Sequence, residues 1–127
     1  MASDDAGSYP DDREIEALLA THLLGWTETR LHPASGTYVG KRPGASAATP
    51  VPLYLLEPDS ANTIVELLVE RGYSFRIERQ PNPLAPVRVV LWGTQEHVAE
   101  GRTLIQAFGR AAWRAIVGSD PGASTPD

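Results

Sequence analysis

The segment SGTYVGKRPG, residues 35–44, is the first place where the sequence suggests chemistry, because Gly-Lys after an earlier glycine is typical of a phosphate-binding loop. Such a loop needs four residues between its glycines, then Gly-Lys and a hydroxyl residue, in a turn from a strand into a helix. Here Gly36 and Gly40 enclose three residues, and Arg42 stands where the hydroxyl belongs. The segment therefore predicts a hairpin strand leaving a turn, with an anion site at Lys41 and Arg42 as the alternative.

The histidines are scattered rather than clustered. His22, His32 and His97 lie in separate segments, and no HxH or HExxH spacing occurs. A metal site needs at least three converging ligands. We therefore predict no metal site, and we interpret His22, on the apolar stripe of a predicted helix, as a hydrogen-bonded residue at the edge of the core.

Neither group of carboxylates has the arrangement of a catalytic pair. The first group opens a predicted helix, where the positive end of the helix dipole favours negative charge. It consists of Asp11, Asp12, Glu14 and Glu16. Glu66 and Glu70 are one turn apart on the polar side of a second predicted helix, which indicates a solvated face. We therefore predict no catalytic residue and no cofactor, and a hydrolase is the weakest alternative.

Basic and aromatic side chains gather on one face of a second predicted hairpin. Alternation along residues 73–79 and 87–93 places four residues on the same face, Arg76, Arg88, Val90 and Trp92. Such a surface suits a protein partner or a nucleotide. The alternative is that a helix covers this face and the arginine stems lie across apolar surface. A three-layer fold favours the covered face.

Length and composition predict one cytoplasmic domain. A chain of 127 residues fits the usual domain size. No apolar run approaches the roughly 18 residues of a membrane span. The acidic start differs from a secretory signal, and the absence of cysteine suits a reducing compartment. The net charge of -5 disfavours general nucleic-acid binding.

Hydrophobic periodicity predicts three helices and two hairpins. The helices cover residues 11–25, 59–71 and 104–116, and the strands cover residues 26–31, 36–41, 73–79 and 87–93. Asp59 or Ser60 is the expected cap of the second helix, and Gly72 its stop. Composition predicts disordered tails over residues 1–10 and 118–127, around one domain over residues 11–117. The predicted fold class is α+β, a small antiparallel sheet of about four strands with three helices, in the order α-β-β-α-β-β-α.

The last predicted helix has an alanine-rich apolar stripe, which allows a close approach to its neighbours. Ala111 lies at the centre of this stripe. Trp113 and Trp92 both lie off the main apolar stripes, and exposed indoles are typical of surfaces that are buried between subunits. The sequence therefore predicts self-association.

Three short motifs carry a resemblance to a known family. Gly25 and Trp26 end the first helix, ERGY at residues 70–73 joins the second helix to a strand, and RAAW at residues 110–113 lies in the last helix. With this spacing, nearly all of the predicted domain resembles the phage ABA-sandwich domain family. It departs from the family in the long loop at residues 42–52 and at Trp113, where an aliphatic residue is usual.

The resemblance implies an α/β/α sandwich and an origin in phage or prophage DNA. The family has no assigned activity, so it contributes no functional residue. Our leading hypothesis is a non-enzymatic accessory domain that acts through protein contacts. The alternative is a small-ligand protein that binds a nucleotide or another anion through Lys41, Arg42, Arg76 and Arg88.

Overall fold

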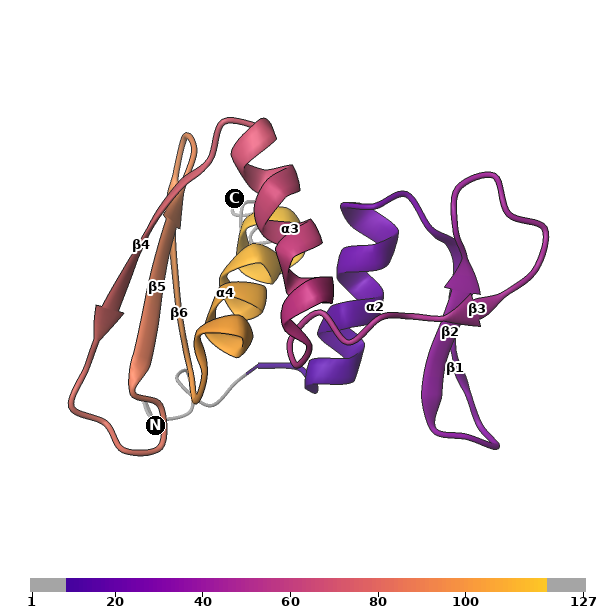
Figure 1. The fold of residues 1–127 in the computed structure, drawn as a ribbon, viewed down its shortest axis with the longest axis horizontal. Helices are drawn as coiled ribbons and strands as arrows, with labels where there is room; N and C mark the ends of the chain where they lie inside the picture. Colours follow the sequence, from indigo (N-terminus) through magenta and orange to yellow (C-terminus); the bar gives the residue numbers. More distant parts are fainter. Residues whose placement is uncertain (1–8, 119–127) are drawn as a thin grey trace, which may run out of the picture.

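The computed structural model describes residues 9–118 and contains three α-helices and two antiparallel sheets (Figure 1). The helices are α2 (Asp12–His22), α3 (Pro58–Glu70) and α4 (Leu104–Trp113), and a π-helical turn, η1 (Arg114–Gly118), extends α4. The strands are β1 (Thr27–His32), β2 (Thr37–Lys41), β3 (Thr49–Pro50), β4 (Ser74–Arg79), β5 (Val87–Trp92) and β6 (Glu96–Gly101). The predicted α+β class and the order of its helices and hairpins are confirmed. Most of the two predicted tails lies outside the described residues.

The strands form two separate sheets instead of the single sheet of about four strands that the sequence suggested. One sheet has the order β1-β2-β3 and the other the order β4-β5-β6. The three helices lie between the sheets, so the layers differ from the predicted α/β/α sandwich (Figure 1). Helix α4 packs on β5 and β6, while α2 packs on β1 and β2. None of the helices in residues 9–118 has the length and apolar character needed to cross a membrane.

The ends of α2 and α3 follow local chemistry. The side chain of Asp11, in the acidic group predicted at this helix start, accepts a hydrogen bond from the Arg13 N–H at 3.1 Å and so caps α2. At α3 the predicted Asp59 or Ser60 cap is wrong, because Glu57 occupies the N-cap and Pro58 begins the helix. Proline has no N–H to satisfy, so the first helical position suits it. Gly72, with φ +92°, ends α3 as predicted.

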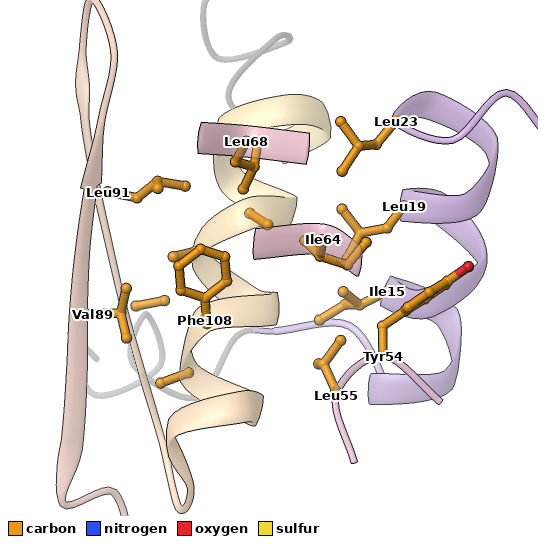
Figure 2. Packing of buried hydrophobic residues seen from close by; sticks show 14 of the residues in the cluster. Ile15, Leu19, Leu23, Tyr54, Leu55, Ile64, Leu68, Val89, Leu91 and Phe108 are labelled. Atoms are coloured by element: carbon orange, nitrogen blue, oxygen red, sulfur yellow. The ribbon is translucent and has the colours of Figure 1, made fainter. Parts of the chain in front are cut away.

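The core joins all three helices to the inner face of β5 (Figure 2). Its largest fully buried apolar side chains include Ile15, Leu19, Ile64, Leu68 and Leu91. The alanine stripe of α4 is buried as well, and Ala111 has no exposed surface. These small side chains allow α4 to lie close to the sheet and to both other helices.

The segment at residues 35–44 is a hairpin strand, as predicted. Strand β2 pairs with β1 through a turn in which Gly36 has φ +71°. A bulge in β1 opposes Gly40, where an added Cβ would lie 2.6 Å from Thr29 Cγ2. These glycines therefore serve a turn and a close backbone approach. The chain continues into a loop rather than a helix, which is incompatible with a phosphate-binding loop.

Candidate functional site

The structure separates the predicted site residues into groups that lie far apart. Lys41 and Arg42 belong to the end of β2 and the loop after it, whereas Arg76 and Arg88 belong to the other sheet. The two sheets lie at opposite ends of the molecule, with the helices between them (Figure 1). The four cations therefore cannot hold one nucleotide together within a single chain.

Arg76, Arg88 and Trp92 share a face of the β4-β5-β6 sheet, as predicted. Glu78 joins them: its carboxylate lies 2.6 Å from Arg76 Nε and 3.6 Å from Arg88 Nε. Arg76 also lies 5.8 Å above the Trp92 ring. The Arg76 hydrogen bond holds the pKa of Glu78 below its ordinary value. One carboxylate thus neutralises part of the positive charge on this face.

The preferred expectation is that a helix covers this face; among the described residues no helix does so, although Val90 on this face is buried as expected, with 1% exposed. Helix α4 packs against the opposite face, where Val89, Leu91 and Ala99 are fully buried. The side chain of Arg76 remains 53% exposed and that of Arg88 42%. Helices line only one side of this sheet in Figure 1.

Arg42, which the sequence analysis named as a candidate anion-binding residue, lines a pocket of about 590 Å³ whose other walls no local sequence pattern indicates. The guanidinium stacks 5.2 Å above the Trp26 ring. Tyr54 also lines this pocket, although only 4% of its surface is exposed. Its hydroxyl has no hydrogen-bond partner among the described residues, and burial raises its pKa to about 12. Lys41 takes no part, since it pairs with Glu28 at 3.3 Å.

Trp113 packs within its own chain. Its ring meets that of Tyr9 edge to face, with centroids 6.3 Å apart. Two arginines of the C-terminal helix also lie against Tyr9, with Arg110 at 4.4 Å and Arg114 at 4.7 Å from the ring centroid. Tyr9, which precedes α2 in the chain, therefore contacts three residues of α4 and η1.

This cluster closes the outer edge of β6. The Glu100 N–H donates to the Tyr9 hydroxyl at 3.1 Å, and that hydroxyl donates to the Glu100 carboxylate at 3.2 Å. Arg110 donates to the Glu100 carbonyl and Arg114 to the Val98 carbonyl, each at 2.9 Å. Side chains thus occupy three of the outward backbone groups of β6, namely the Glu100 N–H, the Glu100 C=O and the Val98 C=O.

Within residues 9–118, no side chain or strand covers the outer edge of β4. The Gln80 N–H donates to the Pro86 carbonyl across the β4-β5 ladder at 3.0 Å. Because hydrogen-bonded pairs alternate in an antiparallel ladder, Ser74, Arg76 and Glu78 bond to β5. The N–H and C=O groups of Phe75, Ile77 and Arg79 therefore point away from the sheet, toward a free edge.

An apolar groove of about 410 Å³ runs beside this edge, between α3, β4 and α4. It is lined by Pro58, Ala61, Asn62, Val65, Phe75, Ile77, Leu104, Ile105 and Phe108. Ile77 is 50% exposed, Leu104 44% and Phe75 36%, although Phe75 also meets the ring of Phe108 edge to face at 5.0 Å. Asn62 is the one amide among these apolar side chains. The groove suits apolar side chains of a partner and offers no group for acid–base chemistry.

No metal centre is formed by the described residues, in which no three His, Asp or Glu side chains come together as possible ligands. The most perturbed carboxyl, Glu16, lies away from the pockets. Its carboxylate pairs with Arg13 at 2.7 Å and accepts the Leu55 N–H at 3.0 Å. Burial nevertheless raises its pKa to about 7. The sequence placed Glu16 in an acidic group that the helix dipole favours, whereas its side chain fastens the segment before α3 to α2.

No protein-family model matches this sequence, and neither does any curated protein. Among solved structures, the fold is similar to the crystal structure of a phage protein from Bacillus cereus ATCC 14579, with a TM-score of 0.64. The match covers 86% of this chain and 95% of that chain, at 17% sequence identity. At this identity the likeness shows a shared fold of α+β class.

Proposed function

We propose that this chain is a phage or prophage accessory domain that acts through protein contacts and catalyses no reaction. The observation that carries the proposal is the free edge of β4 beside the apolar groove. An open strand edge binds another strand through backbone hydrogen bonds, and an adjacent groove takes its side chains. The similar fold of the Bacillus cereus phage protein supports the phage setting.

The two edges of the β4-β5-β6 sheet support this assignment by their contrast. Tyr9, Arg110 and Arg114 bond to the outward backbone groups of Glu100 and to the Val98 carbonyl at the β6 edge. At the β4 edge, the apolar side chains of Phe75 and Ile77 are partly exposed next to unpaired backbone groups. Soluble monomers ordinarily protect an open strand edge that carries apolar side chains, so the exposure of Phe75 and Ile77 beside the β4 edge indicates a binding surface.

Site-specific photo-crosslinking in the cell that carries the gene tests the proposal. A photoreactive phenylalanine analogue in place of Phe75 should give covalent protein adducts, because the ring lies at the mouth of the groove. The matched control replaces Leu31, which is 49% exposed on the other sheet. Adducts from position 75 and few from position 31 are expected. If the photoreactive analogue at position 75 forms no covalent adduct with any protein, the protein-contact role is ruled out.

The pocket at Arg42 favours a second candidate, the binding of a small anionic ligand. The Tyr54 hydroxyl, which has no hydrogen-bond partner among the described residues, and the Arg42 guanidinium on the Trp26 ring are groups that a bound ligand would contact in this pocket. This site requires Arg42 and Tyr54, and it replaces the combined site of four cations that the sequence suggested.

A thermal-shift panel of mono-, di- and cyclic nucleotides at millimolar concentration checks this candidate. A ligand that binds only the folded state raises the Tm, since it stabilises by RT ln(1 + [L]/Kd). Tyr54→Phe removes the unpartnered hydroxyl and should reduce the shift, while Lys41→Gln, which changes a residue paired with Glu28, should leave it unchanged. No shift with any member of the panel argues against nucleotide binding.

A further inference from the structure

Resting on the protein-contact role proposed above, we propose that the partner at this surface is a second copy of the chain. The second copy adds its own β4 antiparallel to the free edge, around a two-fold axis at Ile77. The result is a continuous six-stranded sheet, counting three strands from each copy. Each copy presents the same strand to the other, as a two-fold interface requires.

The backbone sets which registers are available. Phe75, Ile77 and Arg79 carry the outward N–H and C=O groups of β4, for the reason given by the alternation of the β4-β5 ladder. A two-fold axis at Ile77 opposes Ile77 to its own copy and Phe75 to the partner's Arg79. The outward N–H and C=O groups of these three residues then all form hydrogen bonds with the partner strand.

The charges select this register from its neighbours. An axis at Ile77 opposes Arg76 to the partner's Glu78, and Glu78 to the partner's Arg76, on the outer face of the sheet. A shift of the axis to Arg76 would oppose two arginines, and a shift to Glu78 would oppose two glutamates. Opposite charges across a strand pair stabilise it and like charges destabilise it. The sequence SFRIER of β4 is therefore self-complementary about Ile77.

The inner face of the strand pair is favourable as well. In this register the stem of the partner's Arg79 lies opposite the Phe75 ring, where it covers the mouth of the groove. Helix α4 packs on β5 and β6, so it leaves the space above the β4 edge open. Ile77 is the most exposed of the large apolar residues that line the groove, at 50%. The pairing thereby removes the Ile77 side chain from water.

Charge exchange between two variants of the full chain tests the proposal. R76E and E78R each turn both opposed pairs of the dimer into like-charge pairs, and each should raise the dimer dissociation constant at least about tenfold. An equimolar mixture of the two variants restores opposite charges at every pair. Sedimentation velocity over a concentration series should show a dimer for the wild-type chain and for the mixture, and weakened dimers for each variant alone.

Two controls separate this pairing from general charge effects and from other surfaces. R30E makes the same charge change at an exposed residue of β1 and should leave the dimer unchanged. The chain has no cysteine, so a single introduced thiol reports one position. I77C should form a disulfide-linked dimer on mild oxidation, because paired Cα atoms about 5.5 Å apart suit a disulfide. R79C should not, since its two copies would be separated by about 13 Å along the strands.

Each outcome bears on the proposal. A wild-type chain that stays monomeric at every concentration overturns it. A dimer that R76E and E78R leave intact, or that their mixture does not restore, overturns the β4 register. In all three cases a crosslink from position 75 to a different protein would still uphold the protein-contact role, so the two proposals fail separately.

Discussion

At the scale of single residues, Glu16 shows how a helix residue serves tertiary structure. It lies in the first turns of α2, but its side chain is 2% exposed and accepts the Leu55 N–H. A buried carboxyl favours its neutral form, because burial penalises the charge more than Arg13 and the Leu55 amide stabilise it. Glu16 therefore makes the stability of this fold sensitive to pH near neutrality.

The first prediction follows from the sign of that change. Burial raises the pKa of Glu16 from 4.5 to about 7, so the folded state holds its proton more tightly than the unfolded state. The protonated Glu16 carboxyl contributes its full stabilisation of the folded state below pH 4.5, and this stabilisation is lost as pH rises through about 7. Relative to Glu16→Gln, the wild-type free energy of unfolding should fall by about 2 to 3 kcal/mol between pH 5 and pH 8. Urea unfolding at several pH values measures it, and Glu14→Gln, an exposed change nearby, should follow the wild type.

The second prediction concerns Gly109, whose place in α4 is set by Leu55. A Cβ at this position would lie 2.5 Å from Leu55 Cγ. Gly109→Ala should therefore lower the free energy of unfolding by about 1 to 3 kcal/mol, even though alanine is more favourable than glycine in a helix by about 1 kcal/mol. When Leu55→Ala removes the obstacle, the same change should become neutral or stabilising. A double-mutant cycle from urea unfolding checks this coupling, and simple additivity of the two changes would contradict it.

At the scale of elements, local patterns predicted most of the helices and strands but not β6. In β4 and β5 apolar and β-branched residues give a clear strand signal, whereas β6 reads EHVAEG, with two acids and a terminal glycine. Its stability comes from pairing with β5 and from the side chains that occupy its outer edge. Those partners are distant in sequence, so no local window contains them.

The third prediction measures how much that edge depends on one hydroxyl. Tyr9→Phe keeps the ring against Trp113, Arg110 and Arg114 but removes the acceptor of the Glu100 N–H. The loss of this hydrogen bond should lower the free energy of unfolding by about 1 to 2 kcal/mol and speed hydrogen exchange at the Glu100 amide. Tyr38→Phe is the matched control, because the Tyr38 hydroxyl has no hydrogen-bond partner within the described part of the chain. Equal effects of both changes would mean that the edge does not need the Tyr9 hydroxyl.

At the scale of the whole molecule, the candidate site was only partly predictable. Alternation alone grouped Arg76, Arg88 and Trp92 correctly on one face. The free edge and the groove arise from how α3 and α4 sit beside β4, and the pocket at Tyr54 arises from the loop before α3. Such features depend on packing between elements, which the periodicity of each element does not contain.

The fourth prediction follows from the unequal packing of the two sheets. Strand β5 is central and has Val89, Val90 and Leu91 buried, whereas five of the six residues of β1 are exposed. Native-state hydrogen exchange should therefore show the β5 amides opening only with global unfolding, and the β1-β2-β3 amides opening at a lower free energy. Equal protection of both sheets would show that they unfold as one unit.

The contacts of Tyr9 have a consequence for the order of events during synthesis. Tyr9 leaves the ribosome long before Glu100, its partner 91 positions later, and before the two arginines of the C-terminal helix. Until Arg110 and Arg114 have been translated, a nascent chain that has paired β4, β5 and β6 lacks two of the side chains that bond to the β6 edge, so both edges of the sheet are open. Growing chains on neighbouring ribosomes are then open to mispairing, and only the finished helix limits association to one edge.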